Sequence, residues 1–584
     1  MIRFFSVSIF FILGFVVRLQ AQQPAFLQAN VVLPQLQYSA CAWGDFDSDG
    51  DLDLALTGIE NNDPVSKIFR NDNRLFTDIE AGLIPVHNGT VEWGDYDNDN
   101  DLDLLLTGID IVGVPFTMIY QNSNGIFTDS GISLPGIIEG QATWGDYDND
   151  GDLDILLLGN LISEIYRNDG NNSFINITNP FPLMENPMGC WLDYDNNGQL
   201  DVMVCGNTGN GVFSKLYSNN HGIFTEVSVG PGPFLGLQGG QIKCADLDND
   251  GDKDIVITGF DVNIEGYFLQ YRNDGNDHFT KYAEHTSNLV SASIDLGDFN
   301  ADGFMDILLM GRCVGCGGTS VTELYQNLGS FSFLGVVTTL PGFKQGGISW
   351  GDYNNDGFTD LIFTGTDARE APRTGIFMNT LGDTSFFSPN TPPAITDGFN
   401  VSVENDKLLL HWNRSHDGQT PKNALSYNIR IGTQPAMFDI VAPMADLNNG
   451  FRTIVSPGNA GSDTSWIITG IPAGTYYLSV QAIDNGFMPG EFSAPYMFNY
   501  APVGIDGKNT TEPVCVYPNP FTENLQISGK NSSSGLILVY NSKGEMVYDG
   551  HYNCTLNTTN WQKGLYLIRI MNGENNSTTK AMKN

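Results

Sequence analysis

Basic residues are scarce in this chain. It has 584 residues, of which 27 are Lys or Arg and 67 are Asp or Glu, and its formal net charge is −40. Binding to nucleic acid or to an anionic membrane surface depends on Lys and Arg, so both kinds of partner are disfavoured. The acidic residues gather in short segments beside apolar runs, whereas a disordered acidic chain spreads them evenly. This clustering predicts cation sites in a folded protein.

Long hydrophobic runs are also few. Residues 4–17 are apolar, but Arg18 ends this run short of the roughly 20 residues that span a bilayer. With Arg3 before it, the run is typical of a secretory signal peptide, residues 1–21, cleaved after Ala21. We found no later transmembrane segment, and we therefore expect an exported protein.

Cysteine and histidine are too few and too scattered for the common catalytic patterns. None of the seven histidines stands in a zinc-binding spacing such as HExxH, and there is no GxSxG nucleophile elbow. Cys313 and Cys316 form a CxxC, but Gly surrounds it and the helix that follows a redox motif is missing. A local disulfide or two free thiols are the alternatives for this pair.

What the chain does contain is a long repeat. The segment WGDYDNDGDLDILLLG, residues 144–159, has six close copies, and the copies are 47 to 54 residues apart. A period of about 50 residues indicates a repeat architecture. We number the repeats one to seven; their first aspartates are Asp45, Asp95, Asp146, Asp193, Asp246, Asp298 and Asp352.

Each repeat carries the spacing DxDxDGxxD, which predicts a calcium loop. Carboxylates at positions 1, 3, 5 and 9, the backbone carbonyl of position 7 and a water make an all-oxygen shell, and Gly at position 6 allows a sharp turn. An EF-hand needs Glu at position 12, where Leu157 stands in repeat three. A plain polar turn would not need Asp at position 9.

The replacements keep this chemistry. Asn300 and Asn354 stand at position 3, Asn197 stands at position 5, and Asn100 replaces Gly at position 6. The sequence thus predicts up to seven calcium ions. The candidate ligands at positions 1, 3, 5, 7 and 9, repeat by repeat, are Asp45, Asp47, Asp49, Asp51 and Asp53; Asp95, Asp97, Asp99, Asp101 and Asp103; Asp146, Asp148, Asp150, Asp152 and Asp154; Asp193, Asp195, Asn197, Gln199 and Asp201; Asp246, Asp248, Asp250, Asp252 and Asp254; Asp298, Asn300, Asp302, Phe304 and Asp306; and Asp352, Asn354, Asp356, Phe358 and Asp360.

The rest of each repeat predicts four short strands. A buried apolar strand follows the loop, then a strand ending in aromatic-x-Asn, a Phe-centred strand, and a strand leading into the next Trp. Without helical periodicity, the fold class is all-β, with a seven-bladed β-propeller. We expect the motif tryptophans to pack between blades; the alternative is a ring of aromatic platforms for sugars. The interval from Phe to Trp also predicts that residues near Phe26 complete or cover the seventh blade beside Phe386 and Phe387.

These repeats resemble the FG-GAP/VCBS family, the calcium-loop propeller repeats that also occur in integrin α-chains. The pattern YxN…GxFT…WGDYDNDGDLD carries the resemblance, and we assign residues 22–390 to the propeller. The resemblance implies that calcium loops join the first two strands of each blade. It also implies a role in adhesion or extracellular ligand recognition.

Two smaller β-sandwich domains are expected after the propeller. Residues 391–498 resemble a fibronectin type III domain, with an early Trp412 and with Tyr476 or Tyr477 in the tyrosine-corner position. After a linker, residues 499–513, the motifs VYPNPF and GLYLIRI in residues 514–584 resemble the type A C-terminal sorting domain of the type IX secretion system. That resemblance implies a Bacteroidetes-type bacterium and partnership with the secretion machinery.

The sequence favours a secreted or outer-membrane cell-surface protein that binds an extracellular glycan or protein without catalysis. Two alternatives stay open. One is an extracellular polysaccharide lyase or hydrolase on a propeller scaffold, for which 27 basic residues offer no obvious cluster. The other is a structural component of a surface layer or matrix.

Overall fold

The computed structural model describes residues 26–285, 289–383, 387–404, 407–435, 437–446 and 449–500, and shorter pieces of the C-terminal region. Those pieces are 515–517, 522–528, 536–541, 543, 546–551, 555–572 and 575–583. The expected signal peptide, nearly all of the expected linker, Phe386 and residues 518–521 lie outside this description. Within it, no helix is long and apolar enough to cross a membrane.

The chain forms two compact units. One comprises Met1–Ser402, Leu409–Ile471 and Thr475–Asn499, and the other comprises Val403–Leu408, Pro472–Gly474 and Tyr500–Asn584. Both contain β-strands, and the described residues include no α-helix, only the 3-10 turn η1 (Leu381–Asp383). The predicted all-β class is confirmed.

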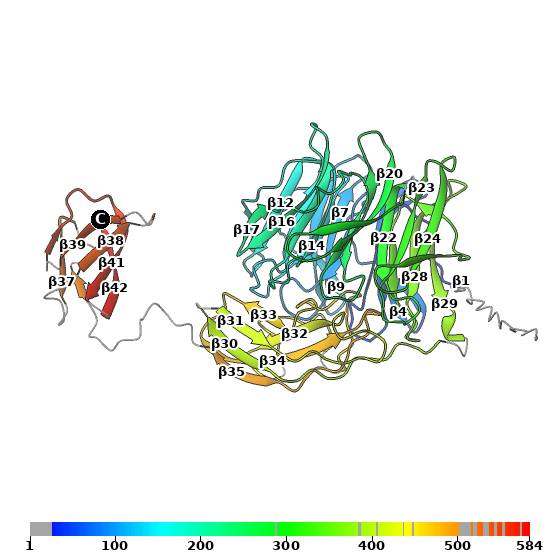
Figure 1. Ribbon diagram of the computed structural model, residues 1–584. Coiled ribbons are helices and arrows are strands. Elements are labelled where there is room, and N and C mark those ends of the chain that lie inside the picture. The colour runs from blue at the N-terminus through cyan, green and yellow to red at the C-terminus, as the bar shows by residue number, and fades with distance from the viewer. Residues whose placement is uncertain are drawn as a thin grey trace, which may run out of the picture. The chain divides into compact units, whose positions relative to one another are not determined.

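Repeats one to five each form a separate four-stranded antiparallel sheet (Figure 1). In every sheet the strands follow one another in chain order. The sheets are β2 (Gln37–Gly44), β3 (Asp53–Glu60), β4 (Asp63–Asp72) and β5 (Leu75–Asp78); β6 (Val91–Gly94), β7 (Asp103–Ile109), β8 (Pro115–Ser123) and β9 (Ile126–Asp129); β10 (Gln141–Gly145), β11 (Asp154–Gly159), β12 (Ile162–Asn168) and β13 (Phe174–Ile177); β14 (Glu185–Leu192), β15 (Asp201–Asn207), β16 (Val212–Asn220) and β17 (Ile223–Glu226); and β18 (Ile242–Ala245), β19 (Asp254–Phe260), β20 (Gly266–Asn273) and β21 (Phe279–His285).

Repeats six and seven share one nine-stranded sheet. A two-residue strand, β26 (Phe343–Lys344), pairs with both β24 and β28 and so joins two four-stranded groups. The first group is β22 (Leu289–Gly297), β23 (Asp306–Cys313), β24 (Thr319–Asn327) and β25 (Phe333–Val336); the second is β27 (Ile348–Gly351), β28 (Asp360–Asp367), β29 (Pro372–Asn379) and β1 (Phe26–Gln28).

The first strand of the described chain therefore completes the last repeat. Phe26 in β1 is paired with Asn379 in β29, although more than 300 residues separate them. Phe387 packs against the hydrophobic cluster that contains Phe26. The pairing confirms the expectation that residues near Phe26 supply the outer strand of the last repeat.

The second strand of each repeat is buried on both faces. In β11, for example, all six residues from Asp154 to Gly159 are buried. Such a strand needs apolar side chains on both sides because neighbouring sheets cover it from both directions. This explains why the acidic loop is followed at once by an uninterrupted apolar run.

The motif tryptophans lie between repeats, as predicted. Each stacks on the aromatic residue at position 2 of the preceding loop, with ring centroids 6.1–6.4 Å apart and planes within 4–16°. The pairs are Trp43–Tyr353, Phe46–Trp93, Tyr96–Trp144, Tyr147–Trp191 and Phe299–Trp350. Since protein rings occupy these faces, the tryptophans are packing residues and not sugar platforms. The pair Trp43–Tyr353 joins the first repeat to the last, as a β-propeller requires.

The next part of the chain forms two three-stranded sheets. One has the order β30–β31–β33, and the other has the order β32–β34–β35. Tyr476 is buried and its ring contacts Phe498, while Tyr427 accepts a hydrogen bond from the backbone N–H of Ser415 through its hydroxyl oxygen. The strands are β30 (Asn400–Glu404), β31 (Lys407–His411), β32 (Ser426–Gly432), β33 (Ser465–Ile468), β34 (Gly474–Ile483) and β35 (Tyr496–Tyr500).

The C-terminal region forms a further pair of sheets, with the orders β36–β37–β40 and β39–β38–β41–β42. A small core of Leu525, Ile537, Val539, Leu556 and Ile568 is buried within it. The strands are β36 (Cys515–Tyr517), β37 (Asn524–Ser528), β38 (Leu536–Asn541), β39 (Met546–His551), β40 (Thr555–Asn557), β41 (Gly564–Asn572) and β42 (Asn575–Lys583).

Candidate metal sites

The acidic motifs form loops of equal length that join the first and second strands of each repeat. We call them the acid loops: residues 45–53, 95–103, 146–154, 193–201, 246–254, 298–306 and 352–360. The carboxylate at position 1 fixes the turn in all seven, because its two oxygens accept the backbone N–H groups of positions 5 and 6. In the first loop Asp45 accepts from Asp49 and Gly50, both at 3.0 Å. The same bonds in the other loops measure 2.7–3.1 Å.

Position 6 has the backbone conformation that the sequence predicts. Gly50 has φ +93°, and Asn100, the only non-glycine residue here, has φ +73°. Glycine reaches this region without a steric penalty, and Asn is among the few other residues that tolerate it.

The aspartate at position 9 does more than the sequence indicated. Asp53 is fully buried; its Oδ2 accepts the N–H of Phe46 at 3.0 Å and its Oδ1 accepts the N–H of Asn71 at 2.7 Å. Repeats two to six repeat both bonds. This carboxylate therefore ties the loop to the third strand. Each oxygen keeps a second lone pair for a cation.

The Asn of the aromatic-x-Asn motif is a functional residue whose role the sequence did not reveal. Its side-chain amide donates to the carbonyl at position 2 of the acid loop of the preceding repeat, at 2.6–3.2 Å. For repeat one, the preceding repeat in the ring is repeat seven. The donors and acceptors are Asn71–Tyr353, Asn122–Phe46, Asn168–Tyr96, Asn219–Tyr147, Asn273–Tyr194, Asn327–Leu247 and Asn379–Phe299. Each acid loop is thereby fixed to the next repeat.

In repeats one to five, three carboxylates of a loop converge. One oxygen from each lies within 4.8 Å of the others in Asp45, Asp47 and Asp53; Asp95, Asp97 and Asp99; Asp146, Asp148 and Asp154; Asp193, Asp195 and Asp201; and Asp246, Asp248 and Asp250. Positions 1 and 3 contribute in every loop, and position 5 or 9 supplies the third group. Such a set of hard oxygen donors suits calcium.

Position 3 gives a second sign that an ion belongs in the loops. The Oδ1 atoms of Asp97, Asp148, Asp248 and Asn354 are buried and have no hydrogen-bond partner. A buried polar atom without a partner costs roughly 1–3 kcal/mol, so such atoms in a native fold call for an explanation. A cation bound by position 3 would supply the missing interaction, and the donor set is therefore compatible with calcium.

Repeats six and seven differ at this position. Asn300 donates to Asp302 at 2.9 Å, and Asn354 donates to the position-9 carboxylate of Asp360 at 2.8 Å. Because an amide takes the place of one carboxylate, each of these loops offers a cation one negative charge fewer.

Side chains at position 7 are engaged elsewhere. Asp51 accepts the backbone N–H of Asn73 at 2.7 Å and the amide of Asn355, in the last repeat, at 2.9 Å. The rings of Phe304 and Phe358 pack beside Gly329 and Gly382. These contacts agree with the role that we expect at position 7, where the backbone carbonyl and not the side chain is the ligand.

Burial disfavours the ionised form of the loop carboxylates when no counter-ion is bound. It raises the pKa of Asp45 to about 7 and that of Asp53 to about 9, with smaller contributions from neighbouring aspartates. The pKa of Asp103 is likewise raised to about 9 and that of Asp201 to about 8. These carboxyls need either a proton or a cation at neutral pH.

The acid loops also contact residues that follow β29 in the chain, a feature that the sequence did not predict. The N–H of Asp45 donates to the carbonyl of Thr453 at 2.8 Å, and the hydroxyl of Thr469 donates to the carbonyl of Asp148 at 3.1 Å. Further contacts are Ala442 N to Asn98 Oδ1 at 3.0 Å, Lys253 Nζ to Ser462 Oγ at 2.7 Å, Asn485 Nδ2 to Gly303 O at 3.0 Å and Asn390 N to Gly357 O at 3.1 Å. Six of the seven acid loops are thus hydrogen-bonded to residues 390–485.

Comparisons with protein families bear on two regions of the chain. Residues 38–106, 146–204, 193–257 and 246–309 match the model of the FG-GAP-like repeat. Residues 515–584 match the secretion system C-terminal sorting domain. This second match indicates export through the type IX system, to the medium or to the cell surface.

Solved structures similar to this chain were also found, and no curated protein matches it. A lectin of Agrocybe aegerita that recognises non-reducing terminal N-acetylglucosamine is 15% identical, with 61% of this chain and 93% of that chain covered and a TM-score of 0.35. A mutant of the Aleuria aurantia lectin with α-methyl-L-fucoside is 8% identical (53% and 98% covered, TM-score 0.33). The V. cholerae biofilm matrix protein Bap1 is 10% identical (82% and 84%, TM-score 0.28). Two parts of this chain thus match family models: the FG-GAP-like repeat, four times within residues 38–309, and the sorting domain at residues 515–584.

Proposed function

We propose that the protein is an exported, calcium-stabilised propeller of seven blades that binds an extracellular glycan or protein without catalysis. The observation that carries the calcium part is the buried, unpartnered position-3 oxygen found in four acid loops. Positions 1, 3, 5 and 9 would hold the ion through side-chain oxygens and position 7 through its carbonyl, in all seven loops. The cyclic order of the Asn–carbonyl bonds supports seven blades, because Asn71 of repeat one reaches Tyr353 of repeat seven.

The domain boundaries belong to the same proposal. Residues 22–390 form the propeller and residues 391–498 a fibronectin type III-like sandwich, which the orders β30–β31–β33 and β32–β34–β35 support. A linker, residues 499–513, precedes the sorting domain, residues 514–584. Calcium stabilises the propeller, and residues of the sandwich hydrogen-bond to the acid loops of the propeller.

We infer the ligand-binding end of the propeller from these contacts. Because residues 390–485 hydrogen-bond to six acid loops, that end of the propeller is occupied by the chain itself. The opposite ends of the same strands carry the turns between the second and third strands. We call these the far turns: residues 61–62, 110–114, 160–161, 208–211, 261–265, 314–318 and 368–371.

The far turns expose apolar side chains, as recognition surfaces often do. Val112 is 77% exposed and Ile264 is 66% exposed. Others with large exposure are Ile111, Val114, Leu161, Val262 and Val314. Loops held by a rigid scaffold are common binding sites, so we assign ligand recognition to the far turns.

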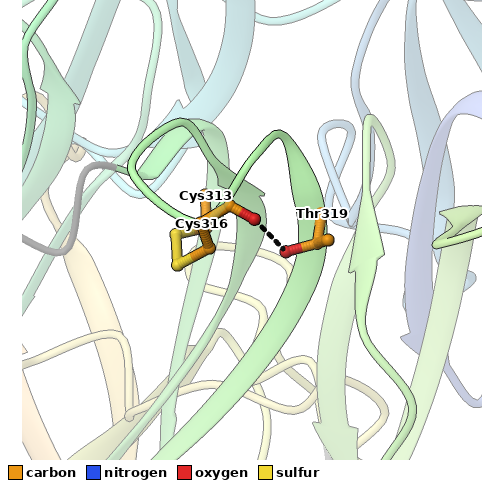
Figure 2. The surroundings of a disulfide bond; sticks show 3 residues. All are labelled: Cys313, Cys316 and Thr319. Carbon is orange, nitrogen blue, oxygen red and sulfur yellow. Dashed lines mark hydrogen bonds between the residues drawn. A yellow bond between two sulfur atoms is a disulfide. The ribbon is translucent and has the colours of Figure 1, made fainter.

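One far turn is braced covalently. Cys313 and Cys316 form a disulfide across the turn between β23 and β24, and the hydroxyl of Thr319 donates to the carbonyl of Cys316 at 3.4 Å (Figure 2). The bond agrees with the local-disulfide alternative for the CxxC. Val314, the first residue of this turn, lies between the two cysteines in the sequence and is 48% exposed.

The ligand assignment is tested by screening the full exported chain on glycan and protein arrays, then comparing two charged variants. Val112→Asp with Ile264→Asp places charges on two far turns and should weaken binding at least about tenfold. Ile223→Asp is the matched control, since Ile223 is 69% exposed but begins the outer strand β17. If the control weakens binding and the far-turn variant does not, the far turns are not the binding surface. Turnover of a bound polysaccharide would instead favour the enzyme alternative.

A further inference from the structure

Two repeats lack the motif tryptophan that ties one repeat to the next. Cys244 stands in its place in repeat five and Leu296 in repeat six. Where Trp is present, its indole contacts the first strand of the preceding repeat: Trp93 donates to the carbonyl of Ala42 at 3.2 Å, and Trp191 to that of Thr143 at 3.4 Å. In both cases the acceptor directly precedes a motif tryptophan in the sequence.

The equivalent neighbour of Cys244 is another cysteine. Cys190 directly precedes Trp191, so it holds the position in repeat four that Ala42 and Thr143 hold in repeats one and three. The two Sγ atoms, from β14 and β18, lie 2.8 Å apart. This separation is closer than non-bonded sulfur atoms normally approach, and it exceeds the covalent S–S length of about 2.05 Å by less than an ångström.

The surroundings favour a bond between these sulfurs. Cys190 and Cys244 are half-buried and both pack against the cluster of Met188, Met203 and Ile255. The backbone positions are fixed by β-ladders, in which Cys190 faces Met203 and Cys244 faces Ile255. Small movements of two side chains would therefore join the sulfurs without any change of strand register.

We propose that Cys190 and Cys244 form a disulfide in the exported protein, and that this bond replaces the missing tryptophan as the tie between repeats four and five. The sorting domain indicates passage through an oxidising compartment, where disulfides form and persist. The bond closes a segment of 54 residues, and cross-links over long segments remove much freedom from the unfolded chain.

The chemistry balances with a disulfide donor, such as a periplasmic thiol oxidoreductase in its oxidised form. The thiolate of one cysteine attacks a donor sulfur and forms a mixed disulfide. The other cysteine then attacks this bond, so that the Cys190–Cys244 bond forms and the donor leaves as a dithiol. The two cysteines lose two electrons and two protons, and the donor gains them.

Peptide mapping of the full chain tests the bond directly. The folded protein is incubated with oxidised glutathione, denatured without reductant, alkylated and digested. We expect one peptide containing Cys190 to be linked to one containing Cys244, while Cys41 and Cys205 are alkylated. Alkylated or glutathionylated Cys190 and Cys244, in a chain whose Cys313–Cys316 bond is intact, would overturn the proposal.

Thermal unfolding tests the mechanical role. Reductant should lower the unfolding midpoint of the oxidised wild-type chain by several degrees, and Cys190→Ser should remove most of that sensitivity. Cys41→Ser, which changes another half-buried thiol, should keep it. The double variant Cys190→Ala/Cys244→Trp restores the usual tie and should be insensitive to reductant with a midpoint above that of Cys190→Ser. Equal sensitivity in wild type and Cys190→Ser would show that no such bond supports the ring.

Discussion

The two ends of the propeller strands follow opposite rules. At one end all seven acid loops have the same length, the same position-1 hydrogen bonds and an Asn that fixes them to the next repeat, and five of them also stack on a motif Trp. At the other end the far turns range from two to five residues and expose different apolar side chains. Uniformity is needed where each repeat must fit the next, and surface turns tolerate variation in length and sequence. The acid loops therefore hold neighbouring repeats together, and the far turns give each repeat a different exposed surface.

Removing calcium should affect the acid-loop end most strongly. A site filled at 100 times its Kd stabilises the folded state by about 2.7 kcal/mol, so even three or four sites rival the roughly 5–15 kcal/mol of an ordinary domain. We expect excess chelator to lower the unfolding midpoint of the full chain by at least about 10 °C. Calorimetry with and without chelator measures this shift, and elemental analysis of the dialysed protein counts the bound ions.

Magnesium is the control for that experiment, because it prefers a strict octahedron and keeps its water. It should restore little of the lost stability. An unchanged midpoint in chelator, or full recovery with magnesium, would remove calcium from the explanation of the acid loops.

The pH dependence of stability should reverse with calcium. Burial raises the pKa of Asp45 to about 7 and of Asp53 to about 9, whereas an unfolded Asp titrates near 3.9. The metal-free fold therefore binds more protons than the unfolded chain, and its stability should fall as pH rises from about 4 through about 9. Calcium takes the place of those protons, so the loaded protein should instead lose stability on acidification.

Unfolding midpoints between about pH 5.5 and about pH 8.5, with chelator and with calcium, check both slopes. A weakly buffered calcium titration should also release protons at neutral pH. A metal-free midpoint that rises with pH would mean that the acid loops do not bury their carboxylates as described.

The sequence predicted the features that depend only on residues within one repeat. The turn at Gly50, the buried second strand and the packing of Trp43 follow from local pattern repeated seven times. The bond from Asp53 to Asn71 joins residues 18 apart across two strands, so it depends on ladder register, which periodicity does not specify. The contact of Thr469 with Asp148 joins residues 321 apart and depends on how two surfaces fit. The Cys190–Cys244 pair was missed for the same reason, since it requires the alignment of neighbouring repeats.

Glycine substitutions should distinguish the two ends at single residues. A Cβ added at Gly94, before the second acid loop, would lie 2.7 Å from the indole of Trp144. Gly94→Ala should destabilise the fold by about 3 kcal/mol, because the ring has no room to move. Gly113 in a far turn has φ +86° and open space around it; Gly113→Asn, which keeps a residue tolerant of that φ, should cost at most about 0.5 kcal/mol. Chemical denaturation of both variants in saturating calcium measures the difference, and equal costs would contradict the division into a packed end and a free end.

The smallest effect should appear within the acid-loop end itself, where repeats six and seven carry Asn at position 3. Asn354→Asp gives this loop carboxylates at all of positions 1, 3, 5 and 9, and should tighten calcium binding there on the order of tenfold, about 1.4 kcal/mol. The same change should destabilise the metal-free protein, since another buried carboxylate then lacks a counter-ion. Asp148→Asn in repeat three is the reverse exchange and should weaken one of the tighter sites by a similar factor. Calcium titration calorimetry should show one tighter site in Asn354→Asp and one weaker site in Asp148→Asn. If neither affinity changes, position 3 shapes the turn without binding the ion, and the sequence differences among the loops do not alter calcium affinity.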